Sequence, residues 1–260
     1  MKQSLKKADY ITIYLNEINS ILDRSINRIK TNSLDVKRIP YAQRGIASFN
    51  LKKAIVNYTF ERTIKTIIEP LIISIDYTYK SWNGFWKLNN SKGQELNQYI
   101  LSAYDEMLWM LSLGFLLDIP NEEFQKLVNV IDKDGVKDNL FEFIIRAKIP
   151  NRKPIEKESY QEFFGVPKVF EKLRLAIKET DKTKAEMLIK EFITKEWYKN
   201  HKDTGWYNSH KSKHNTYFGY WSFETAAVVA IMKLNDSSFR DCEYYPKDLV
   251  DYYRKNHSTT

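Results

Sequence analysis

The sequence is poor in turn-forming residues and has a single cysteine. Only 8 glycines and 7 prolines occur among 260 residues. All-β sandwiches and barrels need many turn residues, so this scarcity disfavours them and favours long helices. Cys242 stands alone, which excludes an internal disulfide and a cysteine zinc cluster. Such cysteine usage fits a reducing compartment.

Long hydrophobic runs are also missing. The most apolar stretch, Met107 to Leu117, is shorter than the roughly 18 residues that a membrane span needs. The N-terminal residues include lysines but no continuous apolar region, so they do not resemble a secretory signal. We therefore expect no membrane association and a cytoplasmic location.

What the sequence does contain is enough apolar material for a core and an excess of positive charge. Apolar residues make up 43%, and the formal net charge is +8. A basic balance is compatible with nucleic acid, anionic lipid or an acidic protein partner. The lysines are spread along the chain without forming a basic arm, which indicates a solvated surface more than direct nucleic-acid binding.

Apolar residues recur at helical spacing through the first half of the chain. Tyr10 to Ile29 forms one such stripe, and the pattern resumes near Gln43 and continues to Ile68. Pro70 is expected to end or kink that second helix. Turn residues at Asn83-Gly84 and Lys92-Gly93 predict a loop, and the strongest predicted helix of this half spans residues 91–117.

The second half continues the helical pattern. Pro120-Asn121 is expected to start a helix, with Asn121 as its N-cap. The other predicted helices span residues 139–148, 167–179, 183–200, 217–234 and 246–255. The sequence pattern predicts no strand. The polar stretch from Pro150 to Pro154 is the best internal boundary, because the residue before each proline resists helix. The sequence thus predicts an all-α bundle of about nine helices, with helical domains over residues 1–149 and 155–260 packed together.

Motifs for metal or cofactor chemistry are weak. His210 and His214 have the spacing of a helical metal site, but a zinc protease would need a glutamate where Lys211 stands. Two histidines alone are too few for a structural zinc. The acidic turn around Asp132 and Asp138 lacks the glycine and glutamate positions of a calcium loop. No phosphate-binding loop or nucleophile motif is present, so no motif points to an enzyme, although an active site can also assemble from distant positions.

One carboxylate stands out in the segment that begins at Tyr217. If residues 217–234 form a helix, Glu224 lies in a stripe with Tyr217, Tyr220 and Trp221. A buried carboxylate is costly unless it is paired or hydrogen-bonded. The favoured interpretation is a structural Glu224 that accepts hydrogen bonds. The alternatives are a partner contact or a catalytic carboxylate with a raised pKa.

The same region resembles the C-terminal domain of PoNi immunity proteins. In that family a G-Y-W-x-x-E-x-A-A helix is followed by a polar acidic turn and a Y-Y-P-x-D-L step. The residues that match this pattern here are Gly219, Tyr220, Trp221, Glu224, Ala226, Ala227, Asp236, Tyr245, Pro246, Asp248 and Leu249. The helical N-terminal half is compatible with the family's N-terminal domain.

The resemblance implies a toxin–immunity pair. PoNi proteins are encoded beside PoNe toxins, which look like DNA-cleaving nucleases, and they bind their cognate toxin in the producer's cytoplasm without a cofactor. The motif residues are then structural or toxin-contact candidates: Tyr217, Gly219, Tyr220, Trp221, Glu224, Tyr245, Pro246 and Asp248.

The positive net charge fits this implication poorly, because DNA-cleaving toxins tend to be basic and an acidic inhibitor would complement them best. Either the cognate toxin domain is acidic or a local acidic patch makes the contact. The candidate patches consist of Glu122 and Glu123, and of Asp236, Asp241, Glu243, Asp248 and Asp251.

The leading hypothesis is a stoichiometric inhibitor of an antibacterial polymorphic toxin. The alternative is a basic helical protein that binds nucleic acid or has a regulatory role, and salt-dependent binding of plain DNA would favour it. A third hypothesis is a metal-dependent hydrolase that uses His210, His214 and Glu224.

Overall fold

The structure, a computed structural model, describes residues 3, 5–7, 9–82, 86–160 and 163–257. It is 63% helical, far above the roughly one third of an average globular protein, so the all-α prediction is confirmed. The chain forms two compact units. Unit 1 contains Met1–Phe85 and Asn208–Gly219, and unit 2 contains Trp86–Tyr207 and Tyr220–Thr260.

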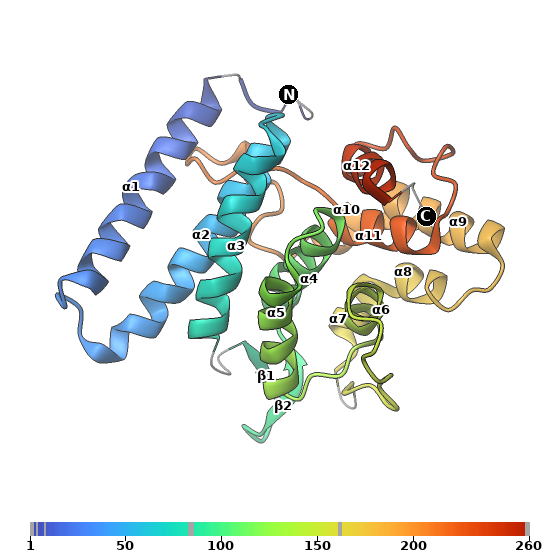
Figure 1. The fold of residues 1–260 in the computed structure, drawn as a ribbon, viewed down its shortest axis with the longest axis horizontal. Coiled ribbons are helices and arrows are strands. Elements are labelled where there is room, and N and C mark those ends of the chain that lie inside the picture. The colour runs from blue at the N-terminus through green and yellow to red at the C-terminus, as the bar shows by residue number, and fades with distance from the viewer. Residues whose placement is uncertain (1–2, 4, 8, 83–85, 161–162, 258–260) are drawn as a thin grey trace. The chain divides into compact units, whose positions relative to one another are not determined.

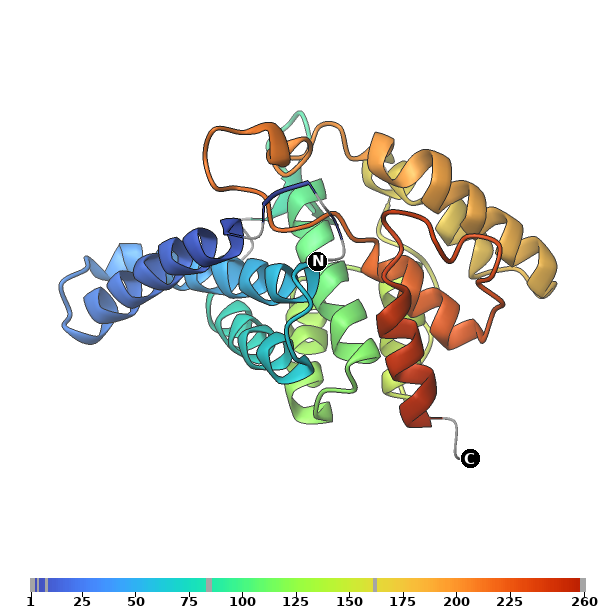
Figure 2. The ribbon, with the colours of Figure 1, turned by 90° about the horizontal axis from the view of Figure 1, so that it is seen from above.

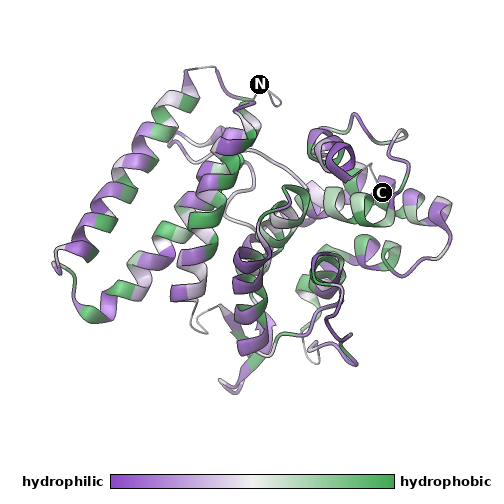
Figure 3. Cartoon of the chain, viewed as in Figure 1, coloured by the Kyte–Doolittle hydropathy of each residue, from purple (hydrophilic) through white to green (hydrophobic). Residues whose placement is uncertain are grey.

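Unit 1 is built on three helices, coloured blue to cyan in Figure 1: α1 (Tyr10–Lys30), α2 (Ile39–Thr59) and α3 (Ile64–Ser81). A short 3-10 turn (Val36–Arg38) precedes α2, and another (Ser209–Lys211) lies in the later segment of the unit. Polar and apolar residues alternate along α1 in Figure 3. Its apolar stripe packs inward through Ile11, Ile18 and Leu22, as the spacing predicted.

The helix expected from Gln43 to Ile68 is interrupted, because the chain turns sharply between α2 and α3. Glu61 adopts a left-handed conformation with φ of 58°. Its N–H donates to the Tyr58 carbonyl at 3.1 Å, and the Arg62 N–H donates to the Asn57 carbonyl at 2.9 Å. These two bonds form a Schellman motif, which ends a helix by satisfying its last carbonyls. The turn lets α3 fold back along α2.

Pro70 was expected to end or kink a helix, but α3 continues past it to Ser81. A proline there cannot donate to the carbonyl four residues earlier, which belongs to Thr66. The side-chain amide of Asn57, on α2, donates to that carbonyl at 2.6 Å. A neighbouring helix thus replaces the missing backbone bond, which a local sequence pattern cannot reveal.

Unit 2 surrounds the almost fully buried helix α4 (Leu101–Leu116), which packs against α5 (Asn121–Lys133), α6 (Asn139–Lys148), α11 (Phe223–Met232) and α12 (Lys247–His257). The helix predicted over 139–148 is confirmed to the residue, and Asp138 caps it by accepting from the N–H groups of Leu140 and Phe141. The expected N-cap of α5 is wrong by one residue, because Pro120 occupies that position.

The predicted helix over 91–117 is wrong in its first ten residues, which belong to a β-hairpin. Strands β1 (Lys87–Asn89) and β2 (Glu95–Tyr99) pair antiparallel. The Asn90 side chain accepts from the N–H groups of Lys92 and Gln94, and Gly93 supplies the left-handed φ of 74°. This local turn competes successfully with the helix. The Asn83-Gly84 part of the expected loop lies outside the described residues.

Two further predicted helices are divided, so the described residues contain more helical segments than the nine expected. Residues 167–179 form α7 (Gly165–Val169) and α8 (Glu171–Ala176). Residues 183–200 form α9 (Lys182–Glu191), a π-helical turn (Phe192–Glu196) and α10 (Trp197–Asn200), which Figure 2 shows as one continuous rod.

The boundary expected at Pro150–Pro154 stays a prediction, and those residues lie within unit 2. Across the described part of the chain, every helix is too short or too polar to span a bilayer.

Candidate functional site

The segment that carries the sequence motif has no regular secondary structure over residues 217–222 and becomes helical only at Phe223. The helix predicted to start at Tyr217 is therefore wrong, and so is the helical face that grouped Tyr217 with Glu224. Tyrosine, phenylalanine, tryptophan and glycine are poor helix formers, and this run consists largely of them. Hydrogen bonds to residues distant in the sequence satisfy several of its backbone groups.

In unit 1, Tyr217 is anchored by α1. The Tyr10 hydroxyl accepts from the Tyr217 N–H at 3.0 Å and donates to the Tyr217 carbonyl at 2.9 Å. The Thr59 hydroxyl donates to the Phe218 carbonyl at 2.8 Å. Gly219 has a φ of 122°, which side-chain-bearing residues rarely adopt, so a glycine is required where the chain leaves unit 1.

Glu224 lies in the first turn of α11 with no exposed surface. Its Oε1 accepts from the Trp197 indole N–H at 2.6 Å and from the Ser222 hydroxyl at 2.7 Å. Its Oε2 has no hydrogen-bond partner. Burial raises the pKa of Glu224 to about 7, and the Ser222 bond opposes this rise. The carboxyl is therefore sealed inside unit 2, with no atom accessible to a substrate or a partner.

His201 and Asp105 form a second buried polar pair near Glu224. The His201 Nδ1 lies 2.6 Å from the Trp197 carbonyl, and its Nε2 lies 3.4 Å from Asp105 Oδ1. The Trp206 indole N–H donates to Asp105 Oδ2 at 3.2 Å. Burial acts to lower the pKa of His201, but Asp105 and the Trp197 carbonyl outweigh it, so the pKa is raised. Because both ring nitrogens face acceptors, the protonated imidazolium fits best.

Aromatic rings enclose this polar cluster. Trp197 lies 5.3 Å from His201 and 5.5 Å from Trp206 between ring centroids. Tyr198 stacks on Tyr244 at 4.9 Å and contacts Tyr220 at 5.1 Å. Such packing excludes water and strengthens the few hydrogen bonds inside. The arrangement can position helices α4, α10 and α11.

The second part of the motif forms a separate network around Asp236, which is buried. The Tyr245 hydroxyl and Arg240 each donate to Asp236 Oδ2 at 3.0 Å, and Arg254 donates to Oδ1 at 3.2 Å. Pro246 is buried beside Tyr245, while Asp248 is exposed in the first turn of α12. Asp236 is therefore part of the interior and is not presented on the surface as an acidic contact.

The remaining acidic candidates are largely matched by neighbouring cations. Asp241 lies 2.6 Å from Lys247, Asp251 pairs with Arg240, and Glu123 lies 2.9 Å from Lys126. Glu122 and Glu243 are exposed. The structure thus divides the predicted acidic patches into the buried Asp236, carboxylates in surface ion pairs, and the exposed Glu122, Glu243 and Asp248.

Sequence reasoning missed Asp138, a buried carboxylate of unit 2 that binds several side chains. It accepts from the hydroxyls of Tyr104 at 3.1 Å and Tyr160 at 2.7 Å and from Arg174 at 2.7 Å. Arg174 also pairs with Glu158. The available signal was its position as a helix cap before residue 139, which does not reveal the distant partners.

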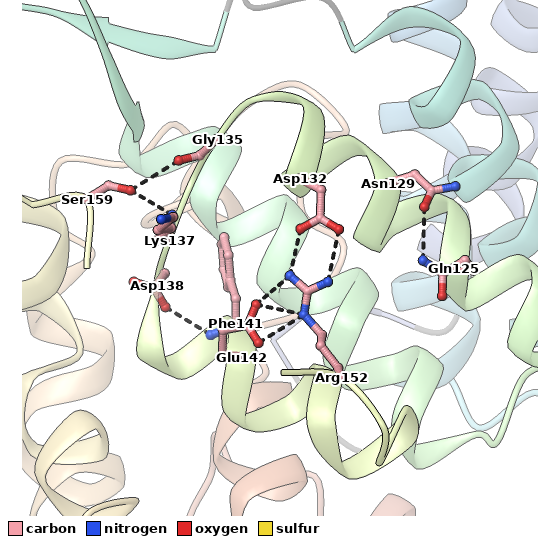
Figure 4. A network of polar contacts seen from close by, with 10 residues as sticks. All are labelled: Gln125, Asn129, Asp132, Gly135, Lys137, Asp138, Phe141, Glu142, Arg152 and Ser159. Carbon is pink, nitrogen blue, oxygen red and sulfur yellow. Dashed lines mark hydrogen bonds and ion pairs between the residues drawn. The ribbon is translucent and has the colours of Figure 1, made fainter. Parts of the chain in front are cut away.

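Arg152 is a second missed residue, and Figure 4 shows its guanidinium between two carboxylates. It donates to both oxygens of Asp132 at 2.9 and 2.6 Å and to Glu142 at 2.6 Å. The pKa of Arg152 is raised by these hydrogen bonds. The polar stretch that looked like a linker is thereby fastened to α5 and α6.

His210 and His214 lie in unit 1, in and just after the 3-10 turn. Among the described residues, no three His, Cys, Asp or Glu side chains are grouped as a metal ion would require. The residues of the hydrolase hypothesis therefore form no metal-binding group in this structure.

Comparison with solved structures identifies a protein with the same fold. The crystal structure of protein PA2201 from Pseudomonas aeruginosa matches with a TM-score of 0.63 and 17% sequence identity, covering 98% of this chain and 91% of that chain. At this identity the likeness shows a shared fold. A comparison with curated proteins finds no significant match.

Two family models match consecutive parts of the chain. The model described as PoNe immunity protein (PoNi), N-terminal, matches residues 2–129, and the model described as PoNe immunity proteins (PoNi), C-terminal, matches residues 136–249. Together they span nearly the whole sequence, in the order of the family's two domains. The chain therefore belongs to the PoNe immunity protein (PoNi) family.

Proposed function

We propose that the protein binds one cognate antibacterial toxin in the cytoplasm of the producing cell and blocks it stoichiometrically, without catalysis. The toxin is a polymorphic toxin with a DNA-cleaving nuclease domain. The observation that carries the proposal is the match of both family models along residues 2–129 and 136–249. The sealed environment of Glu224 supports a structural rather than a catalytic role for the motif.

A protection assay tests this proposal. The toxin domain encoded beside this gene is induced in a susceptible cell, with or without the full chain, and survival is counted. The chain should restore growth against its own toxin and fail against a toxin of a distant relative, because specificity depends on a few surface residues. Equal killing with and without the chain would contradict the proposal.

The alternative function, nucleic-acid binding, has one observation in its favour. Unit 1 carries 16 lysines and arginines against seven aspartates and glutamates, whereas unit 2 carries 25 against 26. Counterion release would make such binding steeply salt-dependent. A gel-shift titration of plain duplex DNA at low and physiological salt separates the two functions, since a stoichiometric toxin inhibitor needs no DNA affinity.

A further inference from the structure

The positive charge of the protein is concentrated in unit 1, and much of it is exposed where α1 connects to α2. Five cations occur between residues 24 and 38, and all are exposed: Arg24, Arg28, Lys30, Lys37 and Arg38. None of them forms an ion pair with a carboxylate of the described residues. Asp35, the one acidic residue in this stretch, accepts from the Lys37 N–H at 2.8 Å. We call residues 24–41 the α1–α2 tip.

The tip also exposes apolar surface. Val36 is 78% exposed and Tyr41 is 62% exposed, which makes Val36 the most exposed large hydrophobic residue of the described chain. Lys37 and Arg38 lie between them in the sequence. A single exposed apolar residue needs no explanation. Tyrosine and arginine are among the residue types enriched in protein-binding hot spots, and Val36 adds exposed apolar surface beside Arg38 and Tyr41.

The backbone of the tip is held in one conformation by its own hydrogen bonds. Asn32 is left-handed with φ of 52°, and the N–H groups of Asn32 and Ser33 donate to the carbonyls of Ile29 and Arg28 at 3.2 and 3.0 Å. This Schellman motif ends α1. Pro40 lies in the first turn of α2, where its fixed φ suits a helix start. A preordered tip loses little conformational entropy on binding.

Exposed cations beside exposed apolar side chains fit a partner surface that carries both negative charge and apolar groups. We propose that the α1–α2 tip is a docking surface for an acidic patch on the cognate toxin, with Lys37 and Arg38 as the charged contacts and Val36 as the apolar one. The inference rests on the proposed function. A nucleic-acid backbone would use the cations but would gain little from an apolar side chain at their centre. An acidic protein surface uses both.

The test measures binding of the full chain to the purified toxin domain, with two variants at the tip. Lys37→Glu combined with Arg38→Glu should weaken binding about tenfold or more and flatten its salt dependence, because charge complementarity governs association. Val36→Ser should weaken binding several-fold with little change in salt dependence. All these side chains are exposed, so the melting temperature should stay close to that of the wild type.

Matched controls come from α9 in unit 2. Lys182→Glu combined with Lys184→Glu makes the same charge change at exposed positions, and Met187→Ser removes a side chain that is 62% exposed. Both controls should bind the toxin like the wild type. If the wild type binds and the tip variants bind equally well, the docking surface is wrong while the proposed function stands. If the wild type does not bind, the proposed function fails first and the inference with it. Loss of duplex DNA binding in the tip variants, with toxin binding intact, would overturn the inference in favour of nucleic acid.

Discussion

At the scale of single residues, the protein keeps ionisable groups inside unit 2 and satisfies most of their atoms. Glu224 and Asp105 each keep one oxygen without a hydrogen bond, and burial raises the pKa of Glu224 to about 7. Buried polar groups of this kind fix the packing of the elements that meet at them. Here they join α4, α10 and α11.

Removing the Glu224 carboxyl should destabilise the fold and leave binding by the folded protein intact. Glu224→Ala leaves the buried Trp197 N–H without its acceptor, which costs roughly 1–3 kcal/mol, and removes one of the two contacts of the Ser222 hydroxyl, which keeps Thr225. The melting temperature should fall by several degrees, while Glu122→Ala, an exposed control, should change it little. An unchanged melting temperature with lost toxin affinity would instead place Glu224 at the interface.

The raised pKa of Glu224 also predicts a pH effect. Between its ordinary value of 4.5 and about 7, the folded protein binds more protons at this carboxyl than the unfolded chain does, so the free energy of unfolding falls as the pH rises. His201, with its raised pKa, acts in the same direction. Its stabilisation is complete below pH 6.5, the ordinary pKa of histidine, and is lost as the pH rises from there through the raised pKa.

Glu224→Gln removes the first of these contributions and keeps an acceptor for Trp197. Thermal denaturation at about pH 5 and about pH 8 should show the variant gaining stability relative to the wild type at the higher pH. The full shift of the Glu224 pKa corresponds to roughly 3 kcal/mol. Parallel pH profiles of the two proteins would show that Glu224 does not titrate in this range.

The burial of Glu224 was the favoured interpretation of the sequence, but the reasoning behind it was local and partly wrong. The helical face that suggested it does not exist before Phe223. Its partner Trp197 and its neighbours His201 and Asp105 lie 23 to 119 residues away in the sequence, where no periodic pattern connects them. Asp138 and Arg152 were missed for the same reason.

At the scale of elements, local pattern predicted α1 and α6 well because their apolar stripes repeat over several turns. It failed where a side chain takes over a backbone bond. Pro70 lies inside α3 because Asn57 on α2 donates to the Thr66 carbonyl. The β-hairpin before α4 depends on Asn90 and Gly93, whose turn outweighs the helical spacing that follows it.

A double-mutant cycle can test whether the Asn57 amide replaces the hydrogen bond that Pro70 cannot donate to the Thr66 carbonyl. Asn57→Ala should cost about 1–3 kcal/mol in the wild-type background, because the Thr66 carbonyl loses its donor. In a Pro70→Ala background the restored backbone N–H can bond to that carbonyl, so the same substitution should cost less. Chemical denaturation of the four proteins measures the coupling. Additive effects would show that the Asn57 amide does not replace the proline's missing bond.

At the scale of the whole molecule, the net charge of +8 is divided unevenly between the two units. Unit 1 accounts for the entire excess, and unit 2 is close to neutral. The sequence alone suggested dispersed positive charge. Its concentration in unit 1 could not be seen there, because unit 1 combines residues 1–85 with residues 208–219, which are far apart in the sequence. The family could be recognised from the motif at residues 219–249, whereas the toxin-contacting surface could not, because nothing in a linear pattern marks it.

The central claim is that protection comes from binding and not from catalysis, and one titration tests it directly. Purified full chain is added in increasing amounts to a fixed quantity of the cognate toxin domain, and the remaining DNA-cleaving activity is measured after a fixed incubation. A tight inhibitor, with nanomolar affinity or about −12 kcal/mol, should reduce activity linearly to zero at about one equivalent. Complete loss of toxin activity with about a tenth of an equivalent, deepening with time, would indicate catalytic inactivation, and full activity at a large excess would contradict inhibition altogether.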